Sequence, residues 1–200
     1  MTAANGRRQQ LRERLRQERR GLASNTRTWA AAEMCRRVTE LEQFAAAKNI
    51  AAYFPFDGEI DTAPLIAAAG AAGKTVYLPV VKPGATLVFA QCTNDTALTP
   101  NRYGIAEPVC PGNEQVAADQ LALILLPLVA FDYSLHRLGM GAGYYDRTLA
   151  PLCDRPIRPY LLGIGYDLQC VDTVFPQGWD VAADAVITEA CTYTNRDGQQ

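Results

Sequence analysis

The chain has 200 residues, of which 48% are hydrophobic and 20% are charged, and its formal net charge is −2. This length can bury one sizeable core, and the even spread of glycine and proline excludes low-complexity and repeat proteins. We therefore expect a single domain over residues 1–200, with residues 1–6 and 193–200 flexible.

The small net charge conceals a basic segment near the start of the chain. Residues 7–20 contain seven arginines and two glutamates, so they carry a local charge of +5 and leave −7 for the rest. Leu11 and Leu15 lie one turn apart, which predicts a helix with a thin apolar stripe and a wide charged face. Such a face either binds an anionic partner or is simply solvated.

Residues 24–44 are predicted to form a helix that packs on the core. Polar capping residues open the segment. Apolar side chains then recur at spacings of three and four residues, at Trp29, Met34, Val38, Leu41 and Phe44.

A strand, a helix and a strand are predicted next. Residues 49–54 form the first strand, and the helix over residues 62–72 has Pro64 in its first turn, where the missing N–H loses no hydrogen bond. Further strands follow at residues 74–81 and 86–91. This order is typical of a crossover in a mostly parallel sheet.

The second half of the chain continues the alternation of strands and helices. Residues 92–120 are expected to be irregular, and they precede an apolar strand at residues 121–130 that is too short to cross a bilayer. The remaining expected elements are a short helix over residues 144–152, strands at residues 158–166 and 184–188, and a polar tail at residues 192–200. We therefore predict an α/β fold, a three-layer sandwich with a central, mostly parallel sheet flanked by helices.

Three glycines occupy alternate positions in the segment RLGMGAGYYDR, residues 137–147. The missing Cβ atoms allow backbone N–H groups to converge on a ligand oxygen, and the following helix adds free N–H groups, so phosphate is the natural ligand. The segment matches neither the P-loop nor the dinucleotide-binding fingerprint. By themselves the glycines are equally compatible with a turn beside core aromatic residues. Arg137, Asp146 and Arg147 favour a site for phosphate and Mg²⁺.

The six cysteines form no C-x-x-C pair and have no histidine at metal-binding spacing. The first residues, MTAANGRR, lack the apolar region of an export signal. We therefore expect reduced thiols in the core and a cytoplasmic location.

The segment RLGMGAGYYDRTL resembles the signature R-L-G-x-G-x-G-Y-Y-D-R-x-L of the 5-formyltetrahydrofolate cyclo-ligase family, also called methenyltetrahydrofolate synthetase. Further segments resemble the family in the expected order: RQQLR at residues 8–12, YFPFDGEIDT at 53–62, YGIAEP at 103–108 and FPQGWDVAADAVITE at 175–189. The resemblance therefore spans nearly the whole chain.

The resemblance implies a ligase that converts 5-formyltetrahydrofolate to 5,10-methenyltetrahydrofolate, with ATP as cosubstrate, Mg²⁺ as cofactor, and ADP and phosphate as the other products. ATP would phosphorylate the formyl oxygen, and N10 would attack the activated carbon. Because no protein nucleophile is required, catalysis would rest on positioning and on neutralising phosphate charge.

The resemblance also implies roles for individual residues. The nucleotide-binding residues would be Arg8, Arg12, Arg137, Leu138, Gly139, Met140, Gly141, Ala142, Gly143, Tyr144 and Tyr145. The folate-binding residues would be Phe54, Glu59, Met140, Gly141, Ala142, Gly143 and Tyr144. Catalytic roles would fall on Arg137 and Tyr145, and Mg²⁺ would be bound by Asp146 and Asp180. The remaining arginines of the basic segment are expected to be solvated surface charges: Arg7, Arg14, Arg16, Arg19 and Arg20.

Some residues depart from the family pattern or receive no role. Ala142 stands where family members often have glycine or lysine. His136, the only histidine, stands where a small or polar residue is usual, and it is assigned no catalytic role. Asp184 is compatible with a structural acid at the start of a strand as well as with a metal ligand, and it is assigned no role.

Two other functions are compatible with parts of the sequence. A nucleic-acid-binding protein would use the basic helix, but the acidic remainder and the lack of an aromatic, basic RNA-binding motif disfavour this. A folate or nucleotide binder that has lost activity would bind without turnover. The leading hypothesis is a monomeric enzyme whose partners are small molecules, with neither nucleic acid nor membrane.

Overall fold

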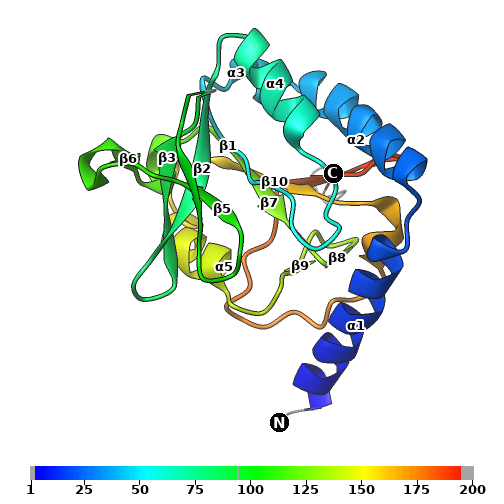
Figure 1. Ribbon diagram of the computed structural model, residues 1–200. Coiled ribbons are helices and arrows are strands. Elements are labelled where there is room, and N and C mark those ends of the chain that lie inside the picture. The colour runs from blue at the N-terminus through cyan, green and yellow to red at the C-terminus, as the bar shows by residue number, and fades with distance from the viewer. Residues whose placement is uncertain (1–2, 94, 195–200) are drawn as a thin grey trace.

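The structure, a computed structural model, describes residues 3–93 and 95–194 (Figure 1). Its α-helices are α1 (Ala3–Arg20), α2 (Ser24–Thr39), α3 (Glu42–Ala46), α4 (Ala63–Ala71) and α5 (Tyr144–Leu149). Within these described ranges, no helix is both long enough and apolar enough to span a membrane.

Over the described residues, the central sheet has eight strands in the order β13-β12-β10-β7-β1-β2-β3-β6. The bounds of its strands are β1 (Asn49–Ala51), β2 (Thr75–Lys82), β3 (Thr86–Gln91), β6 (Gln115–Val116), β7 (Leu123–Pro127), β10 (Tyr160–Ile164), β12 (Ala185–Ile187) and β13 (Thr192–Thr194). Strands β12, β10, β7, β1 and β2 run parallel, whereas β13, β3 and β6 pair antiparallel at the two edges. The mostly parallel sheet and the crossover from β1 through α4 to β2 are thus as predicted.

Two small sheets lie beside the central one. The first contains β8 (Ala130–Asp132), β9 (Arg137–Leu138) and β11 (Cys170–Val171). The second is an antiparallel pair of β4 (Leu98–Pro100) and β5 (Ala106–Pro108). Strand β9 leads directly into the glycine segment, so the first small sheet fixes where that segment begins.

Apolar side chains on the two faces of the central sheet form separate core clusters. Along β7, Leu123 and Leu125 belong to the cluster that also contains residues of α2 and α4, whereas Ile124 and Leu126 belong to the cluster beneath α5. Figure 1 shows α2 and α4 on one side of the sheet and α5 on the other, with α1 extending beside β8. This arrangement confirms the predicted α/β class and its three layers.

Helix α2 is shorter than predicted, and one of its expected core residues is exposed. Leu41 has extended backbone angles (φ −72°, ψ 138°), so residues 24–44 form α2 and α3 rather than one helix. The buried residues of α2 are Ala30, Ala31, Met34 and Val38. Trp29 is not among these buried residues and is 55% exposed, so its predicted core position is wrong.

The predicted strand at residues 121–130 is two strands in different sheets. β7 ends at Pro127, which has no N–H to donate, and β8 then pairs with β9 and β11. The first predicted strand is also short, since β1 ends at Ala51 rather than at residue 54. The limits of these strands depend on which strands pair with them, and an apolar run of sequence does not indicate its pairing partner.

Segments predicted to lack regular structure contain strands. Residues 92–120 include β4, β5 and β6, and the polar tail includes β13, which pairs with β12 through backbone groups and needs no apolar side chains. Residues 3–6 lie in α1 and residues 193–194 in β13. Residues 1–2 and 195–200 lie outside the described residues.

The cysteines are free, but none is fully buried, so the prediction that they lie in the core is wrong. Cys153 and Cys191 are exposed, and the other four are half-buried. A cysteine side chain is small enough to sit at the margin of a core without filling it.

Candidate active site

A cavity of about 650 Å³ lies between α1, the loop that follows β1, and the glycine segment. Its lining includes all the predicted site residues except Leu138: Arg8, Arg12, Phe54, Glu59, Arg137, Asp180 and residues 139–146. Leu138 instead lies fully buried in a core cluster, and its carbonyl oxygen accepts a hydrogen bond from the N–H of Val129 (2.7 Å).

The glycines of the loop lie close to arginine side chains, and Gly143 is the most tightly packed of them. A Cβ atom at Gly141 would lie 3.6 Å from Cζ of Arg12, and one at Gly143 would lie 3.1 Å from a guanidinium nitrogen of Arg147. Both glycines also have positive φ, +106° and +67°, which a side chain would disfavour. The loop therefore brings its backbone close to several cations, an arrangement that suits an anionic ligand.

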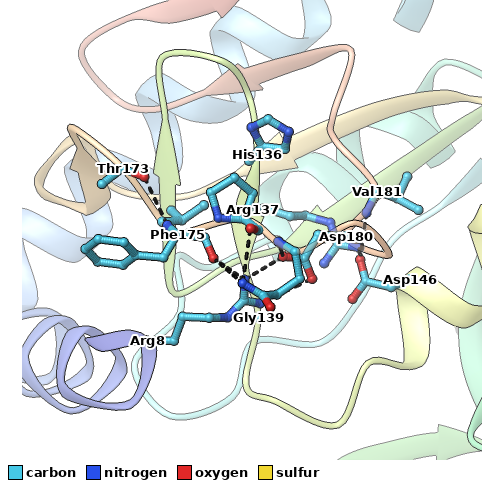
Figure 2. Close-up of polar contacts among 12 residues, drawn as sticks. Arg8, His136, Arg137, Gly139, Asp146, Thr173, Phe175, Asp180 and Val181 are labelled. Carbon is cyan, nitrogen blue, oxygen red and sulfur yellow. Dashed lines mark hydrogen bonds and ion pairs between the residues drawn. The ribbon is translucent and has the colours of Figure 1, made fainter. Parts of the chain in front are cut away.

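Arg8 and Arg12 reach the cavity from one face of α1, as their four-residue spacing predicts. Arg8 is 8% exposed and donates to the carbonyl of Phe175 (2.9 Å) and to both oxygens of Asp180 (Figure 2). Arg12 donates from Nε to the carbonyl of Gly139 (2.8 Å). Burial, and next the charge of Arg8, lower the pKa of Arg12. The pair thus concentrates positive charge beside the glycine loop.

Arg137 and Asp146 form an ion pair at the opposite side of the loop. Asp146 Oδ1 accepts hydrogen bonds from Arg137 (2.8 Å) and from the N–H of Val181 (3.1 Å), as Figure 2 shows. Among the described residues, no group hydrogen-bonds Asp146 Oδ2, and none accepts from the buried Nε of Arg137. A carboxylate oxygen is therefore available to a ligand, and the guanidinium keeps one buried N–H without a partner among these residues.

Glu59 and Tyr145 are ionisable groups at the inner side of the cavity. Glu59 Oε2 accepts a hydrogen bond from the N–H of Phe56 (3.0 Å), and its side chain is 9% exposed. Burial raises the pKa of Glu59 to about 7, although the charge of Arg19 opposes the shift. Burial also raises the pKa of Tyr145, so this hydroxyl remains a donor at neutral pH.

Glu59 should make stability fall with rising pH. Because burial raises its pKa above the ordinary value of 4.5, its stabilising contribution is complete below about pH 4.5 and is lost as pH rises through about 7. The Glu59→Gln variant lacks this titration, so its stability relative to wild type should increase by about 2 kcal/mol between about pH 5.5 and pH 8. Urea denaturation at several pH values measures the difference.

A matched variant for this experiment is Glu40→Gln, which removes an exposed carboxylate far from the cavity. It should keep the wild-type dependence of stability on pH. Parallel profiles for wild type and Glu59→Gln would show that Glu59 does not titrate as described.

Arg19 was expected to be a solvated charge, and this prediction is wrong. Its side chain is completely buried, donates to the carbonyls of Asp57 (2.9 Å) and Leu128 (3.2 Å), and lies 3.7 Å from Glu59. Arg16 (2.6 Å) and Arg20 also pair with Asp57. The C-terminal half of α1 therefore holds the turn that presents Glu59.

The cavity also contains residues to which the sequence interpretation gave no role. Tyr103 lies in the loop between β4 and β5, where its hydroxyl meets that of Tyr144 (2.9 Å). Trp179 and Phe56 line the cavity and are exposed. The YGIAEP resemblance marked the segment of Tyr103, and the match around Asp180 included Trp179, but neither pattern distinguishes a side chain at the cavity from its neighbours.

His136 and Asp184 lie outside the cavity lining. His136 Nδ1 is 3.6 Å from Asp132. Asp184 binds Arg158 through both oxygens (2.7 and 2.6 Å) and accepts a hydrogen bond from the N–H of Leu161. These contacts are in keeping with the structural interpretation of Asp184.

Comparisons with known proteins agree on one family. A model of the 5-formyltetrahydrofolate cyclo-ligase family matches residues 4–189. The 5-formyltetrahydrofolate cyclo-ligase of Haemophilus influenzae is 38% identical over 87% of this chain and 93% of its own length. The enzyme of the same name from Escherichia coli K12 is 35% identical over 87% and 96%.

Solved structures show the same relationship. The 5,10-methenyltetrahydrofolate synthetase of Aquifex aeolicus superimposes with a TM-score of 0.82 at 29% identity, covering 96% of this chain and 95% of that one. A 5,10-methenyltetrahydrofolate synthetase from Mycoplasma pneumoniae superimposes with a TM-score of 0.71 at 25% identity, covering 91% and 98%.

Proposed function

Because the chain belongs to the 5-formyltetrahydrofolate cyclo-ligase family, we propose that it converts 5-formyltetrahydrofolate to 5,10-methenyltetrahydrofolate, consuming one ATP and releasing ADP and phosphate. The observation that carries the proposal is the shared cavity. It places the arginines around the glycine loop in the same space as Glu59 and Phe54. A nucleotide phosphate and a folate ring can therefore meet between them.

In the proposed reaction, the terminal phosphoryl group of ATP is transferred to the formyl oxygen, and ADP is the product of this step. N10 attacks the activated formyl carbon and loses its proton, and the carbon–oxygen bond breaks to release phosphate. Arg8, Arg12 and Arg137 neutralise charge on the phosphoryl oxygens. Tyr145, which keeps its proton, donates a hydrogen bond near the reacting groups rather than acting as a base.

The proposed folate site pairs an apolar surface with a carboxylate. Phe54 packs against the core and also faces the cavity, so it can contact the flat ring. Glu59 accepts hydrogen bonds from the N–H groups of the ring when it is ionised. Between this site and the arginines lie the residues proposed to face both substrates: Met140, Gly141, Ala142, Gly143 and Tyr144.

Mg²⁺ fits the carboxylates of the cavity unequally. Asp146 has a free oxygen, whereas both oxygens of Asp180 accept from Arg8 and one also accepts from the N–H of Gln177. Over the described residues there is no cluster of three or more metal-binding side chains, and Mg²⁺ typically uses one or two carboxylates together with phosphate oxygens. Asp146 would hold Mg²⁺ through its free oxygen, and Asp180 would join it as a second ligand if Arg8 gave up its hydrogen bonds to that carboxylate. When bound, Mg²⁺ supplies neutralisation of phosphate charge.

We also propose an oligomeric state, a compartment and the partners of the enzyme. All the predicted site residues except Leu138 line a single cavity of this chain, and we propose a monomeric enzyme. The six free cysteines support the cytoplasm as its compartment. Small molecules are the only partners that the proposed reaction requires.

The proposed function is tested by following the near-ultraviolet absorbance of the methenyl product. Purified protein with 5-formyltetrahydrofolate, ATP and Mg²⁺ should form product, and reactions that lack ATP or contain EDTA should not. Calorimetry measures folate binding separately. Folate binding without product under all these conditions would contradict the enzymatic proposal and identify a binder.

A further inference from the structure

Tyr53 lies at the inner end of the cavity with its hydroxyl enclosed. The residue is 4% exposed and lines the cavity. Among the described residues, the buried side-chain atoms without a hydrogen-bond partner are the hydroxyls of Tyr53 and Tyr166 and the Nε of Arg137. Buried polar groups are nearly always hydrogen-bonded, so an enclosed hydroxyl beside a ligand cavity indicates a partner that the protein itself does not supply.

The backbone holds Tyr53 in place. The preceding residue, Ala52, donates its N–H to the carbonyl of Tyr77 (2.9 Å), which continues the pairing of β1 with β2. The carbonyl of Tyr53 accepts from the buried hydroxyl of Thr62. The ring packs within the core cluster on the α2 and α4 side of the sheet. The backbone and ring of Tyr53 are therefore held by fixed surroundings rather than by a mobile loop.

Burial, and next the neighbouring charge of Glu59, favour the neutral form of this hydroxyl and raise the pKa of Tyr53 well above its ordinary value. Tyr145 and Tyr166 act in the same direction, and Arg19 opposes them. A neutral phenol can donate one hydrogen bond, whereas the nearby carboxylate of Glu59 can only accept.

We propose that the hydroxyl of Tyr53 is a further folate-binding group, which donates a hydrogen bond to an acceptor on the edge of the bicyclic ring while Glu59 accepts from that ring's N–H groups. The inference rests on the proposed function, since it assigns Glu59 to the same ligand. A donor beside an acceptor matches the alternation of carbonyl and N–H along an amide-like ring edge. An analogue with the donor and acceptor exchanged would leave both protein groups unpaired.

The Tyr53→Phe variant tests this contact, because it removes only the oxygen. Affinity for 5-formyltetrahydrofolate, measured by calorimetry without ATP, should fall about tenfold, the effect expected for one hydrogen bond within a binding site. The Michaelis constant for folate should rise by a similar factor, whereas that for ATP should not change. The melting temperature of the free protein should not fall, because the variant removes an unpartnered group.

The matched control is Tyr166→Phe, which also removes a buried and unpartnered hydroxyl but lies outside the cavity lining. Its folate affinity should equal that of wild type. Unchanged folate affinity in Tyr53→Phe, an equal loss in both variants, or an equal rise in the Michaelis constants for both substrates would overturn the inference. Because calorimetry does not require turnover, a wild-type protein that binds folate without forming product would refute the enzymatic proposal and still allow this test.

Discussion

Replacing Asp146 with asparagine should reduce kcat by about 100- to 1,000-fold and leave the fold intact. Both hydrogen bonds to Asp146 end at Oδ1, and an asparagine side-chain oxygen can accept them from Arg137 and from the N–H of Val181. The variant loses the negative charge that faces the buried guanidinium of Arg137. It also loses the carboxylate oxygen Oδ2, which accepts no hydrogen bond from the described residues of the wild type and is available to a cation. The loss should therefore appear in turnover rather than in structure.

Turnover of this variant is measured from product absorbance at saturating substrates, and its fold is checked by circular dichroism. The control is Asp119→Asn, which also removes a carboxylate paired with an arginine (2.9 Å from Arg155) but lies outside the cavity. This control should retain wild-type kcat. Normal turnover in Asp146→Asn would remove Asp146 from the proposed catalytic arrangement, including its role as a metal ligand.

The parallel sheet could be predicted because its signals are local. Residues 49–54, 62–72 and 74–81 show a strand, a helix and a strand in the pattern of a crossover, and the structure contains β1, α4 and β2 there. The end of β7 could not be predicted, since residues 121–130 are apolar throughout and only their pairing partners divide them into β7 and β8. Local pattern determines the type of an element more closely than its limits.

The glycine loop was predictable for the same reason, whereas its surroundings were not. The signature of residues 137–147 is contiguous, but the guanidinium beside Gly141 belongs to Arg12 at the other end of the chain. Tyr53 follows β1, where a strand was expected, and nothing in that pattern indicates that its hydroxyl lacks a partner. Arg19 is similar to its neighbours in sequence, and its burial depends on contacts 38 and 109 residues away.

Replacing Arg19 with methionine should destabilise the protein by about 3 kcal/mol, because removing one member of a buried ion pair leaves the other charge unpaired. Asp57 retains Arg16 and Arg20 as partners, but Glu59 and the carbonyl of Leu128 lose a neighbouring cation. Urea denaturation at neutral pH measures the loss. Arg14→Met, which removes an exposed arginine from the same helix, should leave stability unchanged. Equal stabilities for wild type and Arg19→Met would contradict the description of the cluster.

The double variant Arg19→Met, Glu59→Gln separates the two causes of this destabilisation. If the unpaired carboxylate of Glu59 dominates, then its neutral replacement should restore part of the stability, and the restoration should be larger at alkaline than at acidic pH. If the lost hydrogen bonds to the carbonyls of Asp57 and Leu128 dominate, the double variant should be as unstable as Arg19→Met at every pH. Since Arg19 opposes the upward shift in the pKa of Glu59, we expect the first result. Arg19 would then act on the proposed folate site by favouring the ionised form of Glu59, from a position outside the cavity lining.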